Sequence, residues 1–121
     1  MDPIEGVLQK IRQFRDERDW KQFHNPKDMS AAIAIEAAEL QELFLWKSQA
    51  ESYQVAITKR QHVEDEIADI ATYLFELADN LGIDLIAAMS AKLEKNALKY
   101  PADRVRGSSA KYTEYVQPKP E

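Results

Sequence analysis

The chain has 121 residues, a length typical of one domain, and its formal net charge of −5 disfavours a general nucleic-acid-binding protein, which needs a basic surface. It contains no cysteine, so disulfides, thiolate zinc sites and cysteine nucleophiles are excluded. No stretch reaches the roughly 20 apolar residues of a membrane span, and the N-terminus lacks a secretory pattern. We therefore expect a cytoplasmic protein, or one of the cytosol and nucleus in a eukaryote, that binds neither nucleic-acid polymers nor membranes.

The apolar periodicity is helical from the N-terminus onward. Asp2 and Pro3 form a good N-cap and first-turn pair, and the apolar stripe of this first helix runs to about residue 18. Residues 19–28 (DWKQFHNPKD) are predicted as an aromatic-rich loop. A second helix is predicted from about residue 26 to Trp46.

Two more helices are predicted after a polar connector over residues 47–58, which could include a short helical turn. Thr58 is the predicted cap of the third helix, which runs to about Leu81 with Gly82 in the C′ position. Asp84 caps the fourth helix, which ends near Tyr100 because Pro101 follows. We expect one domain over residues 1–115 and a disordered tail over 116–121.

Two carboxylate pairs lie on apolar helix faces. Glu36 and Glu39, like Glu66 and Asp69, have i, i+3 spacing, so each pair shares one side of its helix. Apolar residues occupy the same faces: Ile33, Leu40 and Leu43 in the second helix, and Val63, Ile70, Tyr73 and Leu77 in the third. Four bare carboxylates there would cost many kcal/mol unless neutralised. A hard divalent cation is the expected partner, because no Arg or Lys shares these faces.

The acidic residues allow other interpretations. A single Glu-x-x-Glu pair is commonly a solvated helix face, and the metal interpretation depends on finding two such pairs on apolar stripes. A di-iron bundle requires Glu-x-x-His motifs, which neither His24 nor His62 provides. Mg²⁺, or Mn²⁺ in its place, fits better. The remaining acidic residues near these motifs are expected to be solvated: Glu42, Glu64, Asp65 and Glu76.

Aromatic residues suggest a pocket for a planar base. Two tryptophans and a histidine in a loop or at a helix end suit stacking on a nucleobase. Ordinary core packing is the alternative for Phe23 and Tyr73, and loop capping is the alternative for His24. The whole aromatic set is Trp20, Phe23, His24, Trp46 and Tyr73.

Basic and polar residues gather toward the C-terminus. Lys92, Asn96 and Lys99 share one helix face and could hold phosphates, although a solvated face is the commoner explanation for each of them. No Walker-type glycine loop and no Gly-x-Ser-x-Gly motif occurs.

Both carboxylate helices carry a second apolar face. A four-helix monomer rarely covers both faces of two helices. We therefore expect a homo-oligomer built from helical hairpins. The residues of these second faces are Ala34, Ala38 and Leu45, and Ala68, Ala71 and Phe75.

With these motifs in place, the sequence resembles the all-α nucleoside triphosphate pyrophosphohydrolases of the MazG-like superfamily, whose signature is Glu-x-x-Glu, a spacer and Glu-x-x-Asp. The resemblance is strongest to the dCTP pyrophosphatase subgroup. It covers most of the chain and rests on ERDWKQFHNP (17–26), EAAELQELFLWK (36–47), EIADIATYL (66–74) and KYPADRVRGSSAKYTE (99–114).

The resemblance implies an all-α, four-helix MazG-like bundle that is completed by oligomerisation, as a tetramer formed from two dimers. It implies Mg²⁺-dependent hydrolysis of dNTPs, most of all dCTP and 5-modified dCTP, to the monophosphate and pyrophosphate. Alternatives are a related enzyme acting on dUTP, general NTPs or phosphoribosyl-ATP, and a non-catalytic helical nucleotide-binding or interaction module. Vertebrate members carry a substrate-contacting histidine where this chain has Ile11, a departure that bears on base and sugar selectivity.

The resemblance also assigns roles to residues of this sequence. The catalytic and metal-binding residues it implies are Glu36, Glu39, Glu66 and Asp69. The substrate-binding residues it implies are Trp20, Lys21, Gln22, Phe23, His24, Trp46, Tyr73, Asn96, Lys99 and Lys111.

Overall fold

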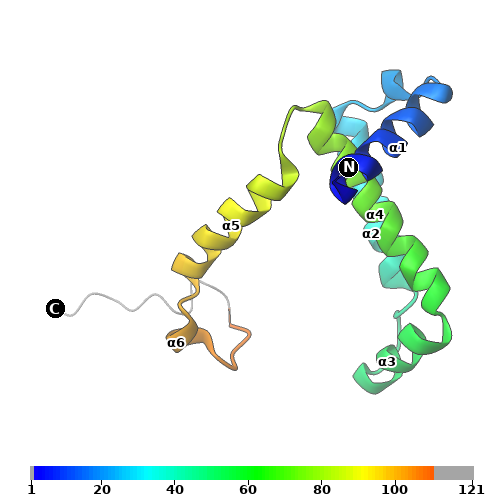
Figure 1. The fold of residues 1–121 in the computed structure, drawn as a ribbon. Coiled ribbons are helices and arrows are strands. Elements are labelled where there is room, and N and C mark those ends of the chain that lie inside the picture. The colour runs from blue at the N-terminus through cyan, green and yellow to red at the C-terminus, as the bar shows by residue number, and fades with distance from the viewer. Residues whose placement is uncertain (1, 111–121) are drawn as a thin grey trace. The chain divides into compact units, whose positions relative to one another are not determined.

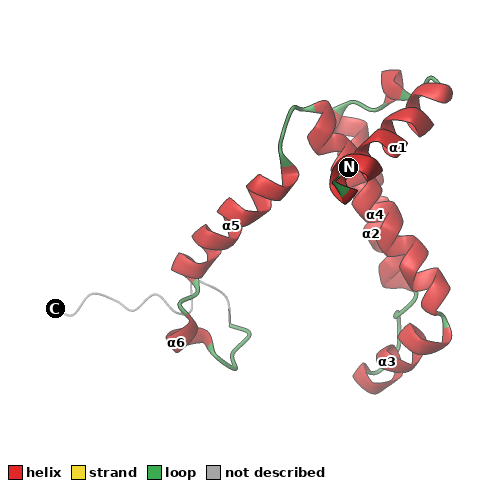
Figure 2. Ribbon diagram, in the orientation of Figure 1, coloured by secondary structure: helices red, strands yellow, loops and turns green. Residues whose placement is uncertain are grey.

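The computed structural model describes residues 2–110, so the predictions for Lys111 and for the 116–121 tail lie outside the described residues. Within this range the chain is helical and contains no strand, which confirms the all-α prediction (Figures 1 and 2). The elements are α1 (Pro3–Glu17), the 3₁₀ turn η1 (Lys21–Phe23), α2 (Pro26–Glu42), α3 (Gln49–Thr58), α4 (Arg60–Asn80), α5 (Leu85–Lys99) and α6 (Ala102–Val105).

Side-chain caps fix three helix starts. The Asp2 side chain accepts a hydrogen bond from the backbone N–H of Ile4, and Asn25 accepts one from Asp28, with Pro26 in the first turn of α2. The Asp84 side chain accepts from Ala87 at 3.0 Å. These contacts satisfy donors that the first helical turn leaves unpaired. The predicted starts of the first, second and fourth helices are therefore confirmed.

The prediction of a connector with at most a short helical turn over residues 47–58 is wrong, because Gln49–Thr58 forms the ten-residue helix α3. A capping box begins it: Ser48 Oγ accepts from the Glu51 N–H at 3.1 Å, and Glu51 Oε1 accepts from the Ser48 N–H at 3.0 Å. Val55 is buried and anchors the helix. The Ser-x-x-Glu spacing was present in the sequence and could have predicted this helix.

Helix boundaries near the site also differ from the prediction. Thr58 ends α3 rather than capping α4, and its hydroxyl donates to the Gln54 carbonyl oxygen at 3.0 Å. Helix α2 ends at Glu42, and the chain then turns so that Trp46 has a φ of 63°. Gly82 has a φ of 69° just after α4, a left-handed conformation that favours glycine, as predicted.

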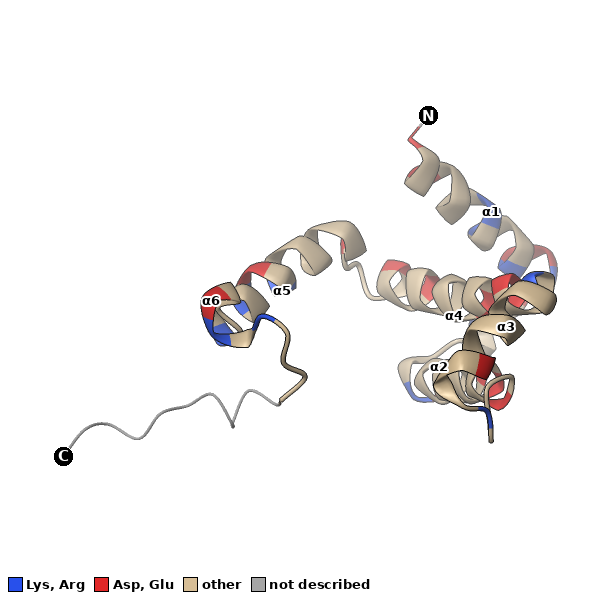
Figure 3. Cartoon of the chain, turned by 90° about the horizontal axis from the view of Figure 1, so that it is seen from below, with Lys and Arg blue, Asp and Glu red and all other residues tan. Residues whose placement is uncertain are grey.

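The chain divides into two units, Met1–Ile83 and Asp84–Glu121. In the first unit α2 and α4 lie side by side, and α1 and α3 also contact α4 (Figure 1). Acidic positions occur on α2 and along α4 (Figure 3). The second unit contains α5 and α6. In residues 2–110, the buried apolar side chains are Ile11, Met29, Val55 and Ala78.

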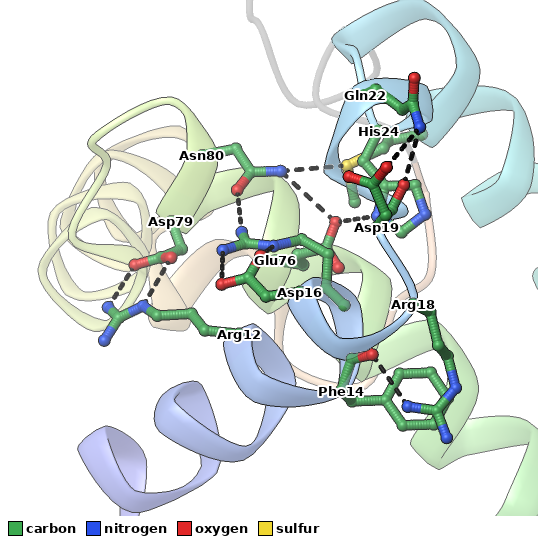
Figure 4. A network of polar contacts seen from close by, with 12 residues as sticks. Arg12, Phe14, Asp16, Arg18, Asp19, Gln22, His24, Glu76, Asp79 and Asn80 are labelled. Atoms are coloured by element: carbon green, nitrogen blue, oxygen red, sulfur yellow. Dashed lines mark hydrogen bonds and ion pairs between the residues drawn. The ribbon is translucent and has the colours of Figure 1, made fainter.

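Polar contacts join α1 to α4 (Figure 4). Arg12 on α1 donates two hydrogen bonds to the Asp79 carboxylate, at 2.9 and 2.6 Å, and a third to Glu5 at 3.2 Å. Arg15 is buried and donates to the Asn80 side-chain oxygen at 2.8 Å. These contacts hold the C-terminal half of α1 against the end of α4.

No helix in residues 2–110 has both the length and the apolar character needed to cross a bilayer. The cytoplasmic location and the 1–115 domain stay predictions.

Candidate active site

Three of the four predicted carboxylates meet where α2 lies beside α4. One carboxylate oxygen from each of Glu36, Glu39 and Glu66 lies within 4.8 Å of the other two. Glu36 and Glu39 come from adjacent turns of α2, and Glu66 comes from α4. We call these three residues the carboxylate cluster.

The cluster contains two buried oxygens that lack partners. Among residues 2–110, Glu36 Oε2 and Glu66 Oε2 are closed off from solvent and accept no hydrogen bond. A buried carboxylate oxygen without a donor is costly, because it has lost its water and gained nothing in exchange. A hard cation would restore the lost stabilisation, and an all-oxygen donor set suits a divalent ion such as Mg²⁺ or Mn²⁺.

The electrostatics of Glu36 lead to the same conclusion. Burial raises its pKa from an ordinary 4.5 to about 7, helped by a hydrogen bond with Glu39 and by repulsion from Glu39, Asp69 and Glu66. The site therefore favours an added positive charge, which a proton or a metal ion can supply.

The prediction that all four carboxylates face a dry interior is only half right. Glu36 and Glu66 are half-buried, whereas Glu39 and Asp69 are exposed. Asp69 also lies outside the carboxylate cluster. It lies near enough for its charge to raise the Glu36 pKa, and it lines a cavity together with Glu36. Asp69 is exposed because the face of α4 that carries it borders this cavity.

That cavity, of about 520 Å³, is lined by residues of α1, the loop after it, α2 and α4, and we call it the aromatic cavity. A row of three rings lines it, from Trp20, His24 and Tyr73. The ring centroids of Trp20 and His24 are 6.3 Å apart, and those of His24 and Tyr73 are 6.5 Å apart. Phe14 continues the row, 5.8 Å from Trp20. Such a row of rings can hold a flat, partly polar ligand.

A second cavity, of about 590 Å³, adjoins the carboxylate cluster through Glu39 and Glu66. Basic side chains line it as well, namely Lys47, Lys59 and His62. His62 Nε2 lies 3.4 Å from Glu66 Oε1. His62 was not among the predicted site residues, although its i, i+4 spacing from Glu66 could have suggested this contact.

Comparison with known proteins shows the family to which the chain belongs. The profile of the MazG-like family matches residues 31–115, which include the whole carboxylate cluster. The chain belongs to the MazG-like family. The resemblance found from the sequence motifs is thereby confirmed.

Two curated relatives and one solved structure are similar to most of the chain. The chain is 39% identical over 113 residues to "dCTP pyrophosphatase 1" of Rattus norvegicus and of Homo sapiens, a match covering 92% of this chain and 66% of each relative. The chain thus spans just under two thirds of the length of these relatives. A crystal structure of a pyrophosphatase from Archaeoglobus fulgidus superposes with a TM-score of 0.80 and 42% identity, covering 84% of this chain and 94% of that one.

The substrate-binding residues predicted for this MazG-like chain fall into separate groups. Trp20, His24 and Tyr73 line the aromatic cavity, and Trp46, 92% exposed, lines the second one. The three exposed residues of η1, which are Lys21, Gln22 and Phe23, line neither cavity.

Phe23 is 60% exposed, so the core-packing alternative for it is wrong. Asn96 and Lys99 lie on α5 in the second unit.

The prediction that Glu76 is a solvated surface charge is wrong. Glu76 is 5% exposed, and its Oε2 lies 2.6 Å from Nδ1 of His24. Its position three residues after Tyr73 and seven after Asp69 puts it on the same helix face, a register that could have revealed it. Glu42, Glu64 and Asp65 are exposed, as predicted.

Proposed function

We propose that this MazG-like chain is a Mg²⁺-dependent dNTP pyrophosphohydrolase that converts dCTP and 5-modified dCTP to the monophosphate and pyrophosphate. The observation that carries the proposal is the carboxylate cluster, with two buried and partnerless oxygens, at the edge of an aromatic cavity. The names of the dCTP pyrophosphatase relatives and of the archaeal pyrophosphatase support the same reaction.

Glu36, Glu39 and Glu66 would hold the metal ion, with Asp69 beside them at the cavity. A bound Mg²⁺ supplies positive charge that positions phosphate oxygens and offsets the negative charge that develops on them during cleavage. Mn²⁺, with similar ligand preferences, would substitute.

The carboxylates would also position and deprotonate the attacking water. The water attacks phosphorus in line with the P–O bond between the α- and β-phosphates and loses a proton to a carboxylate acting as general base. That P–O bond breaks, so the nucleoside monophosphate and pyrophosphate separate. We assign this role to Glu36 or Glu39. Glu39 is exposed and in reach of solvent, and Glu36 lines the aromatic cavity.

The nucleobase would occupy the aromatic cavity, against the rings of Trp20, His24 and Tyr73. Phosphates would then lie toward the carboxylates at the cavity edge, where Glu36 and Asp69 line the wall. The family resemblance is the basis for two further parts of the proposal. One is substrate binding by the η1 residues and Trp46, and the other is phosphate binding by Asn96, Lys99 and Lys111.

We further propose that a homotetramer, formed from two dimers, completes the four-helix bundle. Within residues 2–110 few apolar side chains are buried, whereas many large ones are exposed. Ile67 and Leu74 on α4 are 52% and 42% exposed. A stripe on α5 is similarly open, with Ile86 at 43%, Met89 at 52% and Leu93 at 65%. Apolar surface on this scale favours association with further copies.

The deciding experiment incubates the purified chain with dCTP and Mg²⁺ and measures pyrophosphate and dCMP. We expect both products in equal amounts, their loss with EDTA and their recovery with excess Mg²⁺. A panel of dNTPs and NTPs in the same assay ranks substrates. Release of inorganic phosphate in place of pyrophosphate, or no product from any nucleotide, would contradict the proposal.

A further inference from the structure

Glu76 is a buried carboxylate in the wall of the aromatic cavity. Its Oε2 accepts from Nδ1 of His24 at 2.6 Å and from Nδ2 of Asn80 at 3.4 Å (Figure 4). This contact with the carboxylate places the His24 proton on Nδ1. Both hydrogen bonds of Glu76 thus use a single oxygen.

Neighbouring residues fix the side chain in this position. Asn80, which donates to Glu76, accepts at its Oδ1 from Arg15 Nη1 at 2.8 Å. Arg15 in turn donates from Nε to Asp16 at 2.8 Å. The Glu76 carboxylate is therefore held by a network from α1, α4 and the loop after α1, and it presents a fixed rather than a mobile acceptor.

The other oxygen of Glu76 is available to a ligand. No hydrogen bond within residues 2–110 uses Oε1, and this atom is not one of the partnerless oxygens that are closed off from solvent. Because Glu76 lines the aromatic cavity, the opening for Oε1 is toward that cavity. The cavity wall has two other carboxylates. Glu36 belongs to the carboxylate cluster and Asp69 lies near it, where the phosphates are expected.

We infer that Glu76 is a specificity-determining residue, whose Oε1 accepts a hydrogen bond from the exocyclic amino group of a cytosine base. Cytosine carries an amino donor at the position where uracil and thymine carry a carbonyl acceptor. A carboxylate accepts from the first and repels the second, because it has no proton to donate. The inference deepens the proposed function and rests on it.

Lys10 and Thr72 are the other polar side chains of the wall outside the aromatic row. Lys10 is a donor only, so it cannot favour an amino group over a carbonyl. Thr72 can both donate and accept, so it discriminates weakly between the two bases. Among the described residues of this wall, Glu76 is thus the carboxylate, an acceptor that cannot donate, that lies away from the carboxylate cluster.

The test compares kcat/KM for dCTP and dUTP in the wild-type chain, Glu76→Gln and the control Glu64→Gln. Glutamine keeps the shape of Glu76 but adds a donor that a carbonyl can accept from. We expect the wild type to prefer dCTP and Glu76→Gln to lower the dCTP/dUTP ratio roughly tenfold or more. Glu64 is an exposed residue of the same helix, so its variant should keep the wild-type ratio.

The contrary outcomes are distinct. An equal loss of activity toward both substrates in Glu76→Gln would show that Glu76 only positions His24, and would overturn the inference. If that variant does not fold, the wild type decides: equal kcat/KM for dCTP and dUTP overturns it as well. Failure of the proposed function looks different, since the wild type then yields no pyrophosphate from any dNTP. Calorimetric titration with dCMP and dUMP would in that case decide the inference, and equal affinities would refute it.

Discussion

Glu36 on α2 and Glu66 on α4 bring carboxylate oxygens within 4.8 Å of each other, and each residue also keeps one buried oxygen without a hydrogen-bond partner. Two negative groups this close, both short of donors, repel each other unless a cation or a proton lies between them. The pairing of α2 with α4 therefore creates a site that is incomplete without an added positive charge.

Removing a carboxylate at or beside this site should remove most of the turnover without unfolding the chain. We expect Glu39→Ala and Asp69→Ala each to lower kcat/KM for dCTP by about 100-fold or more, a typical loss for an electrostatic group at a reacting centre. Both residues are exposed, so circular dichroism and the melting temperature should stay close to the wild type. Full activity in either variant would refute the role given to that residue.

The stability of the metal-free chain should depend on pH through Glu36. Its pKa rises from 4.5 to about 7 on folding, so the folded chain binds this proton more tightly than the unfolded chain. The free energy of unfolding should therefore fall as the pH rises from about 4.5 to about 7. Urea unfolding in EDTA at several pH values measures this slope.

Glu36→Gln is the matched variant for that experiment, since it keeps the volume and removes the titrating group. Its unfolding free energy should vary less with pH over the same window. Saturating Mg²⁺ should also reduce the fall in the wild type, because a bound cation replaces the proton. Identical pH slopes for wild type and variant would contradict this assignment.

The contact between Arg12 and Asp79 should stabilise α1 against α4. Asp79 accepts two hydrogen bonds from the guanidinium, which hold the pKa of its carboxyl below the ordinary value. Asp79→Asn should measurably lower the free energy of unfolding at neutral pH, although solvent screening of the partly exposed pair keeps the change small. Chemical denaturation measures it, with the exposed Glu17→Gln as the control. Equal stability of the two variants would show that this ion pair contributes little.

The apolar stripe on α5 should lie in the oligomer interface. Light scattering at micromolar concentration should give the mass of a tetramer, and Leu93→Glu should lower it, because a buried unpaired charge is costly. Ala91→Glu adds the same charge on the opposite side of the helix, where we expect no effect. A monomeric mass for the wild type would contradict the proposed tetramer, and equal masses for both variants would exclude this stripe from the interface.

Features set by neighbouring residues could be predicted from the sequence. Local hydrogen bonds at Asp2, Asn25 and Asp84 fix helix starts, and i, i+3 spacing fixes that Glu36 shares a side with Glu39. The same local chemistry gives the all-helical fold and the acidic motifs of the MazG-like family. Helix α3 belongs to this class too, since its capping box lies within four residues.

Contacts between distant segments were decided by the tertiary structure. Helical periodicity predicts the helix face on which Glu76 lies. It does not predict the hydrogen bond between Glu76 and His24, because His24 lies in a loop without a regular repeat. The exposure of Asp69, next to the half-buried Glu66, likewise depends on how α1 and its loop leave a cavity over α4. The sequence alone determined which side chains share a helix face, because that depends on a helix repeat common to all chains. Only the packing of the helices decided which of those faces were buried, hydrogen-bonded or exposed to solvent, because burial depends on the surrounding segments.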